Sequence, residues 1–322
     1  MYWIFKGEIK MIKVFEAFAG YGSQSLALKY LNIPHKVVGI SEIDKWAIKA
    51  YNALHDNVKN YGDISKINPC DLPDFDLFTY SFPCQDISIA GYQKGIKQGT
   101  RSGLLYECEK IIEVKQPKYL LLENVKQLVG KRFKPQFDDW LKYLESLGYT
   151  NYWKVLSATD YGVAQTRKRV FVVSILNDTQ GFTFPTPFPL EKTLKDYLEN
   201  EGEATQEYYL NKPFELVDKK NVVAEITTYK YNAARRIYGL NSLAPTLACG
   251  GGGQERPKIL INGKVRLLTP RETFRLMGLR EREIDKIQSL RFSKSRQYIL
   301  AGNSIVIDVL ANIFKQLFKE EH

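Results

Sequence analysis

Tyr80-Ser81-Phe82-Pro83-Cys84-Gln85 places a thiol directly after a predicted strand. The strand itself is Phe75-Asp76-Leu77-Phe78-Thr79-Tyr80, whose mostly apolar and aromatic residues are typical of a strand buried in a parallel sheet. In open α/β sheets, ligands bind outside the carboxyl ends of the strands. Cys84 is therefore a candidate functional thiol. The alternative is a buried cysteine that acts as a small apolar side chain.

Two patterns upstream have the same strand-to-loop arrangement. The first predicted strand, Ile12–Phe18, leads into the small-residue loop Ala19-Gly20-Tyr21-Gly22-Ser23 and then a helix. The second, Lys36–Ser41, ends at Glu42, roughly 20 residues after the glycine loop. Backbone N–H groups of such a loop approach a ligand closely, and an acid at the end of the second strand accepts hydrogen bonds from ribose hydroxyls. Together they predict a nucleoside-containing cofactor, although Glu42 could instead be a solvated residue that opens the next helix.

Charged groups follow further predicted strands. Asp63, in Gly62-Asp63-Ile64, is placed to accept a hydrogen bond from an exocyclic amine or to cap a helix. The strand Tyr119–Leu122 ends at Glu123-Asn124, so this carboxylate should face the same crevice as the thiol. The basic run Thr166-Arg167-Lys168-Arg169 precedes another strand. The glycine- and lysine-rich segment Gly91–Gly103 is long enough to be a functional lid.

The alternation of strands and helices predicts an α/β protein with a Rossmann-like sheet and helices on both faces. The alternation fades from Phe182 to about Lys264, where prolines, an acidic stretch and a basic-aromatic stretch predict a small, loop-rich second domain. We expect residues 1–178 to form the first domain and residues 179–265 the second. Residues 266–322 are expected to be a C-terminal segment that returns to the first domain.

The composition limits the partners and the compartment. The 322 residues include 46 Lys and Arg against 36 Asp and Glu, a formal net charge of +10. This excess favours nucleic acid as a partner, although it can serve solubility alone. Cys70, Cys84, Cys108 and Cys249 show no Cys-x-x-Cys spacing and only three His accompany them, so we expect no metal site. No apolar run approaches the roughly 20 residues of a membrane span. We expect a reduced, cytoplasmic protein, for which Met11 is an alternative start.

Taken in order, these segments resemble the cytosine-5 DNA methyltransferase family over nearly the whole chain. Phe18-Ala19-Gly20-Tyr21-Gly22 is similar to the family's cofactor loop, Phe82-Pro83-Cys84-Gln85 to its Pro-Cys-Gln motif and Glu123-Asn124-Val125 to its Glu-Asn-Val motif. The chain departs from the pattern at Glu16, Ser23, Ser81 and Ile43, but no predicted catalytic group is missing. The remaining matches are Glu42, Asp63-Ile64, Arg101-Ser102-Gly103-Leu104, Gln165-Thr166-Arg167-Lys168-Arg169, Arg266–Gly278 and Gly302-Asn303-Ser304.

The resemblance implies a methyltransferase sheet and a covalent reaction on cytosine. Cys84 would add to carbon 6 as a thiolate, which makes carbon 5 nucleophilic enough to take a methyl group. Glu123 would donate near ring nitrogen 3, and Asn124 would orient Glu123 and the turn before the thiol. Arg169 would contact the cytosine carbonyl oxygen, and Arg167 the neighbouring phosphate or the thiolate.

The same resemblance implies S-adenosylmethionine as the methyl donor, S-adenosylhomocysteine as the product, and no metal. Phe18 would lie against the adenine, Glu42 on the ribose and Asp63 on the adenine amine. The predicted cofactor-binding residues are Phe18, Ala19, Gly20, Gly22, Glu42, Ile43, Asp63, Ile64, Pro83, Leu104, Asn303, Ser304 and Ile305.

Double-stranded DNA is the implied partner, with the target cytosine flipped out of the duplex. Residues 1–178 would then carry catalysis and cofactor binding, and residues 179–265 would recognise the target. We further expect a monomer in the cytoplasm of a bacterial or phage-infected cell, with or without a separately encoded restriction endonuclease. The predicted DNA-binding residues are Gln85, Ser88, Arg101, Arg235, Arg236 and Gln254.

Three other functions stay open on the sequence alone. A tRNA cytosine-5 methyltransferase would share the fold, and a non-catalytic DNA-binding member would share the domains. A methylase of free pyrimidine nucleotides would use similar thiol addition but would need neither the net charge of +10 nor a second domain. The intact Cys84, Glu123 and Arg169 favour an enzyme. The long segment between Ile175 and Arg266 favours duplex DNA.

Overall fold

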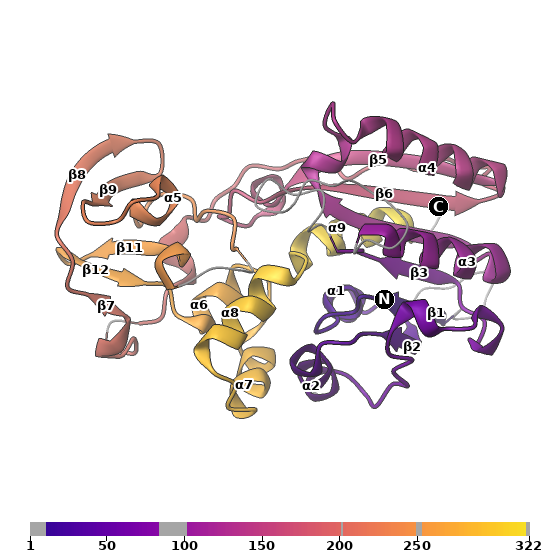
Figure 1. Cartoon of the computed structure of the whole chain (residues 1–322), viewed down its shortest axis with the longest axis horizontal. Helices are drawn as coiled ribbons and strands as arrows, with labels where there is room; N and C mark the ends of the chain where they lie inside the picture. Colours follow the sequence, from indigo (N-terminus) through magenta and orange to yellow (C-terminus); the bar gives the residue numbers. More distant parts are fainter. Residues whose placement is uncertain (1–10, 84–101, 201, 249–252, 320–322) are drawn as a thin grey trace. The chain divides into compact units, whose positions relative to one another are not determined.

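The computed structural model describes residues 11–83, 102–200, 202–248 and 253–319. These residues form two compact units (Figure 1). The first unit comprises the described parts of Met1–Leu156, Lys168–Thr186 and Val309–His322, and the second comprises those of Ser157–Arg167 and Pro187–Asp308. Four predicted site residues lie outside the described residues: Cys84, Gln85, Ser88 and Arg101.

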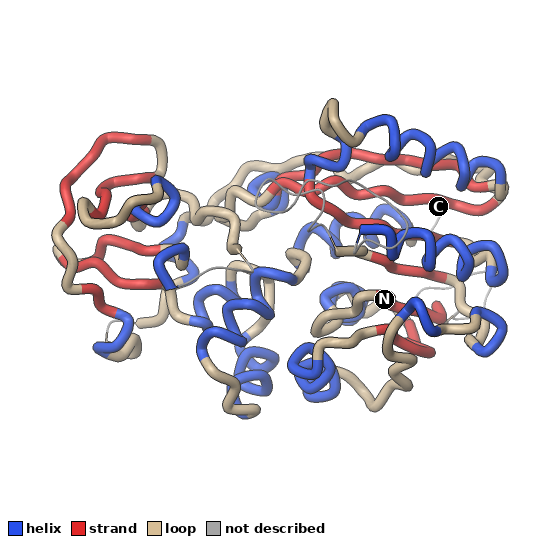
Figure 2. The backbone as a smooth tube through the Cα atoms, viewed as in Figure 1, coloured by secondary structure: helices blue, strands red, loops and turns tan. Residues whose placement is uncertain are grey.

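A twisted sheet forms the centre of the first unit (Figure 2). The described strands have the order β2-β1-β3-β4-β6-β5. Parallel pairing joins β1 to β2 and β3, and β3 to β4, whereas β6 runs antiparallel to β4. This sheet confirms the predicted α/β fold. Its strands are β1 Ile12–Ala17, β2 His35–Ser41, β3 Leu77–Tyr80, β4 Tyr119–Val125, β5 Tyr149–Ser157 and β6 Lys168–Leu176.

Helices flank this sheet because crossovers join its parallel strands. The chain moves outward in one direction from β1 to β2 and in the other from β3 to β4, so right-handed crossovers place α1 and α3 on opposite faces. Figure 1 shows α3 and α4 side by side over one face, where Tyr80, Leu122 and Trp140 belong to one buried apolar cluster. The helices of this unit are α1 Ser23–Tyr30, α2 Lys45–Leu54, α3 Leu105–Lys115, α4 Lys134–Ser146 and most of α9 Ile307–Leu317.

The carboxyl ends of the parallel strands meet at one edge of the sheet. Ala17 pairs with both Ser41 and Tyr80, and β3 continues in register with β4. β6 begins at this edge because it runs antiparallel to β4, with Arg169 opposite Val125. The strand order reverses between β1 and β3, which is where ligands bind in open α/β sheets.

The second unit contains a separate sheet of short strands. Their order among the described residues is β7-β12-β11-β10-β9-β8. Ala224, Ile226, Ile237 and Val265 form its small apolar core. The segment predicted to be loop-rich thus also contains strands, which run from two to six residues and leave little periodic pattern in the sequence. The strands are β7 Tyr209–Leu210, β8 Phe214–Lys219, β9 Val222–Ile226, β10 Arg236–Tyr238, β11 Lys258–Ile261 and β12 Lys264–Leu267, and the helices are α5 Asn232–Arg235, α6 Pro270–Arg275, α7 Glu281–Ser289 and α8 Lys294–Asn303.

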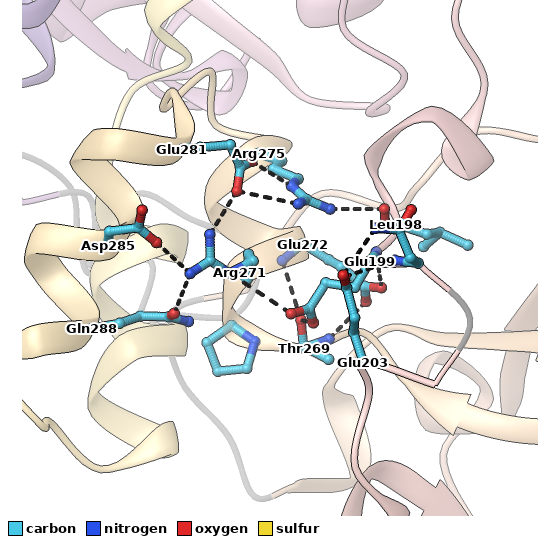
Figure 3. Close-up of polar contacts among 12 residues, drawn as sticks. Leu198, Glu199, Glu203, Thr269, Arg271, Glu272, Arg275, Glu281, Asp285 and Gln288 are labelled. Atoms are coloured by element: carbon cyan, nitrogen blue, oxygen red, sulfur yellow. Dashed lines mark hydrogen bonds and ion pairs between the residues drawn. The ribbon is translucent and has the colours of Figure 1, made fainter.

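Ion pairs tie α6 to the rest of the second unit (Figure 3). Arg271 contacts Glu281 at 2.6 Å and Asp285 at 2.5 Å, both on α7. Arg275 contacts Glu281 at 2.6 Å and donates to the Leu198 carbonyl at 2.7 Å. The described residues of 187–308 belong to the second unit, whereas the predicted domain boundaries lie after residues 178 and 265. The division by function at those boundaries stays a prediction.

One helical stretch, Lys294–Leu317, is long and apolar enough to cross a membrane by length and composition. It is an exception to the prediction that no apolar run is that long. In the described structure 72% of its most apolar window is buried inside the protein. This burial accounts for its composition without a membrane.

Candidate active site

Asn124 holds the turn that follows β3. Its Nδ2 donates to the carbonyl oxygen of Phe82 at 3.0 Å, and its Oδ1 accepts from the Val125 N–H at 2.8 Å. The side chain is buried, so bulk water does not compete for either bond. Pro83 follows Phe82 directly and precedes the predicted thiol, Cys84. These are the contacts that an orienting role for Asn124 requires, and the role itself stays a prediction.

Glu123 and Arg169 form an ion pair at the same edge of the sheet. Arg169 Nε lies 3.2 Å from Glu123 Oε1, and the two side chains are only 18% and 11% exposed. Arg169 pairs with Val125 on β4, two residues after Glu123, so the two charged side chains emerge on one face. Shielding from water strengthens the attraction between them. The structure thus brings together these two predicted catalytic residues.

Arg167 makes contacts that its predicted role did not include. Its side chain is buried, and its Nη1 donates to the Leu247 carbonyl at 3.3 Å. Its Nη2 donates to the carbonyls of Gly302 at 3.0 Å and Ser304 at 2.8 Å, at the end of α8. The last carbonyls of a helix lack partners within the helix, and the guanidinium supplies them. Arg167 thus binds main-chain carbonyls of the second unit, and its contact with a phosphate or the thiolate stays a prediction.

Gln165 has a similar role that the sequence reasoning missed. It is fully buried, and its Nε2 donates to the Leu276 carbonyl at 2.9 Å. Its Oε1 accepts from the Leu247 N–H at 3.2 Å. Gln165 and Arg167 therefore hold the same segment, from two sides of Leu247. The only signal in the sequence was the presence of Gln165 in the Gln-x-Arg-x-Arg motif.

The predicted cofactor residues fall in both units. Asn303 is exposed at the end of α8. Ser304 is buried, and its hydroxyl donates to the Ala301 carbonyl at 2.8 Å. Ile305 is also buried. The residues that belong to the first unit are Phe18, Ala19, Gly20, Gly22, Glu42, Ile43, Asp63, Ile64, Pro83 and Leu104.

The loop after β1 has an unusual backbone. Phe18 has a φ of 55°, Gly20 of 59° and Gly22 of 81°, all in the left-handed region that favours glycine. The Phe18 N–H donates to the Ser41 carbonyl at 2.8 Å, and the Gly20 N–H donates to Glu42 Oε2 at 2.9 Å. The loop is therefore fastened to the end of β2.

Glu42 keeps room for one more hydrogen bond. Its Oε1 accepts from the N–H groups of Ile43 and Asp44, each at 2.8 Å, and its Oε2 accepts from Gly20. Burial raises the pKa of Glu42, and these three bonds oppose that rise. A carboxylate has about four acceptor positions, so one on Oε2 is left for a ligand hydroxyl.

The space around the loop suits a nucleoside. A Cβ added to Gly20 or to Gly62 would meet no atom of the described residues within 4 Å, so a ligand can approach the backbone at both positions. Asp63 is half-buried, and its Oδ1 accepts from the Ser65 N–H and hydroxyl, which lower its pKa. Asp63 thus caps a short helix, which confirms one of the two roles predicted for it. The residues of the first unit therefore fit the adenosine part of the predicted donor.

Among the predicted DNA-binding residues, three are described. Arg236 and Gln254 are exposed. Arg235 Nη2 lies 3.3 Å from Glu215 and 3.4 Å from Glu225, so this guanidinium joins α5 to β8 and β9. No group of three or more His, Cys, Asp or Glu side chains among the described residues is arranged to hold a metal ion.

Comparison of the sequence with known proteins identifies its family. The sequence model described as C-5 cytosine-specific DNA methylase matches residues 12–319. The chain belongs to the C-5 cytosine-specific DNA methylase family. It is similar to the type II methyltransferase M2.ScrFI of Lactococcus lactis subsp. cremoris, with 42% identity over 97% of this chain and 100% of the relative. It is also similar to the type II methyltransferase M.HhaI of Haemophilus parahaemolyticus, with 33% identity over 94% of this chain and 93% of the relative.

Membership of the C-5 cytosine methylase family makes this chain an enzyme, a DNA cytosine-5 methyltransferase. Solved structures agree on the fold. The S. pombe Dnmt2 methyltransferase superposes with a TM-score of 0.76 at 22% identity, over 95% of this chain and 98% of that one. The Entamoeba histolytica methyltransferase EhMeth superposes with a TM-score of 0.74 at 18% identity, over 96% and 98%.

Proposed function

We propose that this methylase is sequence-specific and acts through a covalent adduct between Cys84 and carbon 6 of a flipped cytosine. One observation carries the proposal. The Glu123–Arg169 ion pair lies at the sheet edge where Asn124 holds the turn leading to Cys84. An acid, a cation and a fixed main chain before the thiol in the sequence are the groups that this addition needs.

The chemistry assigns a role to each of these groups. Cys84 attacks as a thiolate, and its addition to carbon 6 breaks the aromaticity of the ring. Negative charge then builds toward ring nitrogen 3, where Glu123 in its protonated form donates the proton, while Arg169 contacts the carbonyl oxygen. Carbon 5 takes the methyl group. Water removes the carbon-5 proton, the thiolate leaves carbon 6, and the proton on nitrogen 3 returns to Glu123.

Membership of the family implies S-adenosylmethionine as the methyl donor, which supplies an electrophilic sulfonium methyl group and leaves as S-adenosylhomocysteine. Glu42 accepts from a ribose hydroxyl through its remaining Oε2 position. Asp63 accepts from the adenine amine, and Phe18 lies against the ring. The other contacts in this proposal come from Ala19, Gly20, Gly22, Ile43, Ile64, Pro83, Leu104, Asn303, Ser304 and Ile305.

The DNA part of the proposal rests on charge and on exposure. The net charge of +10 suits a phosphate backbone. The exposed Arg236 and Gln254 on the second unit are proposed to contact base edges or phosphates. A duplex hides its bases, so the target cytosine is flipped out at a cost of about a few kcal/mol. We further propose a cytoplasmic monomer, with or without a cognate endonuclease.

Methyl transfer to DNA tests this function directly. The enzyme is incubated with labelled S-adenosylmethionine and mixed-sequence duplex DNA, and the product is sequenced after bisulfite treatment. We expect protected cytosines in one short sequence context, which also identifies the target. Label on tRNA but not on DNA would assign the chain to an RNA substrate, and label on neither would favour a non-catalytic DNA-binding role.

A further inference from the structure

A fully buried carboxylate lies at the end of β1. Glu16 Oε1 accepts from the Ser25 N–H at 3.0 Å and from the Ser25 hydroxyl at 2.8 Å. Its Oε2 accepts from the Tyr51 hydroxyl at 2.8 Å. Glu16 has no solvent exposure, and its hydrogen bonds go to Ser25 and Tyr51. It therefore joins three elements of the first unit: β1, the first turn of α1 and α2.

This carboxylate replaces a normal helix cap. The N-cap position of α1 is Gly22, which has no side chain to bond the free N–H groups of the first turn. Glu16 bonds the Ser25 N–H instead, and its negative charge suits the positive end of the helix dipole. The capping oxygen thus comes from β1. The Gly22 N–H donates to the Ala19 carbonyl at 2.9 Å, and the Gly22 carbonyl accepts from the Leu26 N–H at 3.0 Å.

Tyr51 and His55 fill the space under Gly22. A Cβ at Gly22 would lie 2.3 Å from His55 Nε2 and 2.7 Å from the Tyr51 ring. His55 Nε2 lies 3.0 Å from the Tyr21 carbonyl oxygen. The centroids of the Tyr51 and His55 rings are 4.3 Å apart. A capping Ser or Asp at position 22 would clash with both rings, so the glycine and the distant cap depend on each other.

We propose that Glu16, Tyr51 and His55 are positioning residues that keep the loop Gly20–Gly22 and the first turn of α1 in the form that binds the methyl donor. They thereby set the affinity for the donor, a statement that rests on the proposed function. Gly20, Gly22 and Phe18 hold left-handed conformations that a free loop leaves easily. Without the contacts from these three residues, the loop would become ordered only when the donor binds. The conformational entropy lost at that step weakens binding.

The test removes one hydroxyl. Tyr51→Phe keeps the ring against His55 and Gly22 but loses the bond to Glu16. Tyr152→Phe is the matched control, because the Tyr152 hydroxyl donates to the Asp178 carboxylate at 2.6 Å, away from the loop. The dissociation constant for S-adenosylhomocysteine is measured by calorimetry for wild type and both variants, together with their melting temperatures.

We expect Tyr51→Phe to raise that dissociation constant about tenfold, with Tyr152→Phe unchanged. The KM for S-adenosylmethionine should rise in parallel. The kcat at saturating donor and the dissociation constant for duplex DNA should stay within about twofold. Equal donor affinity in wild type and Tyr51→Phe overturns the proposal, as does equal weakening in both variants. Wild type that binds no S-adenosylhomocysteine overturns the proposed donor instead, and this inference with it.

A second pair of variants distinguishes an effect on donor binding from a loss of folding. Glu16→Ala removes the cap, whereas Glu16→Gln keeps an oxygen for Ser25 and places an amide beside Tyr51. We expect Glu16→Gln to recover most of the donor affinity that Glu16→Ala loses. Donor affinity as high in Glu16→Ala as in wild type contradicts the proposed support.

Discussion

The side-chain amide of Asn124 links two neighbouring strands: its Nδ2 lies 3.0 Å from the carbonyl oxygen of Phe82. Asn124 belongs to β4, and Phe82 follows the end of β3. The other end of the amide accepts from the Val125 N–H, so the amide cannot rotate without losing a bond. The position of the turn before Cys84 is therefore set from β4.

Replacing Asn124 by Ala should slow methyl transfer without preventing folding. The Phe82 carbonyl loses its donor, the turn gains freedom, and a displacement of about 1 Å at a reacting group costs roughly 100-fold in rate. We expect kcat to fall about 10- to 100-fold with little change in the dissociation constant for DNA. Asn151→Ala is the matched control, because its amide donates to the Leu141 carbonyl at 2.9 Å elsewhere in the unit. Equal kcat values for the two variants would refute the role of Asn124.

Replacing Arg169 and replacing Arg167 should have different effects on catalysis and on stability. Arg169→Lys changes the geometry of a guanidinium paired with Glu123, and charged hydrogen bonds of this kind contribute about 1.5–3 kcal/mol. We expect kcat to fall about 10- to 100-fold at an unchanged melting temperature. Arg167→Lys leaves buried carbonyls without donors and should lower the melting temperature by roughly 5–10 °C. Exposed Lys168→Ala is the control for both. A catalytic loss in Arg167→Lys at full stability would instead support the predicted phosphate or thiolate contact.

Cys84→Ser should abolish turnover while DNA binding survives. A hydroxyl is a far weaker nucleophile than a thiolate, so no adduct forms at carbon 6. Duplex DNA containing 5-fluorocytosine should trap wild type covalently and leave the variant free, as seen on a denaturing gel. Cys70→Ser replaces an exposed free thiol and should trap normally. Methylation by Cys84→Ser at the wild-type rate would rule out the covalent mechanism.

The first sheet and its edge were predictable because their signals are local. A buried strand followed by a loop can be read within ten or so residues, and parallel strands bring their carboxyl ends to one edge. Glu42, Glu123 and the glycine loop were located in this way. The pairing of Glu123 with Arg169 was not predicted, because it depends on β6 running antiparallel to β4.

Other features depend on contacts that no local pattern contains. The partners of Arg167 are carbonyls more than 80 positions away at Gly302 and Ser304, so its role depended on where the chain returns. The strands of the second sheet are too short for a clear period. The roles of Tyr51 and His55 were not predicted, because Gly22 was interpreted as a ligand contact and its contacts with these two rings depend on the tertiary structure.

The buried ion pair of the second unit should be important for stability. Arg266 Nη2 lies 2.6 Å from Glu272 Oε1, Nη1 lies 2.8 Å from Oε2, and the two side chains are 2% and 0% exposed. Arg266→Ala strands a buried carboxylate, which costs about 3–5 kcal/mol. We expect a large loss of stability in urea denaturation. Lys110→Ala, which breaks an exposed pair with Glu107, should change stability by less than about 1 kcal/mol.

Titration of His55 and of Glu16 should change the stability of the protein with pH in opposite directions. Burial lowers the pKa of His55 from 6.5 to about 4. Between these values the unfolded chain binds a proton that the folded ring refuses, so stability from His55 is present above pH 6.5 and is lost as pH falls toward 4. His55→Gln lacks this loss. The difference in unfolding free energy between wild type and His55→Gln should therefore shrink by roughly 2–3 kcal/mol from pH 7 to pH 4.5.

Glu16 should act in the other direction over nearly the same range. Burial raises the pKa of Glu16 from 4.5 to about 6, against its hydrogen bonds from Ser25 and Tyr51. The folded protein then binds a proton before the unfolded chain does, so wild type gains stability as pH falls from 6 to 4.5. Relative to Glu16→Gln, wild type should gain roughly 1–2 kcal/mol from pH 7 to pH 4.5. Urea denaturation of wild type and both variants at the two pH values measures the opposite slopes. A stability difference that does not change with pH for either variant would mean that the replaced group has the same pKa in the folded and unfolded chain.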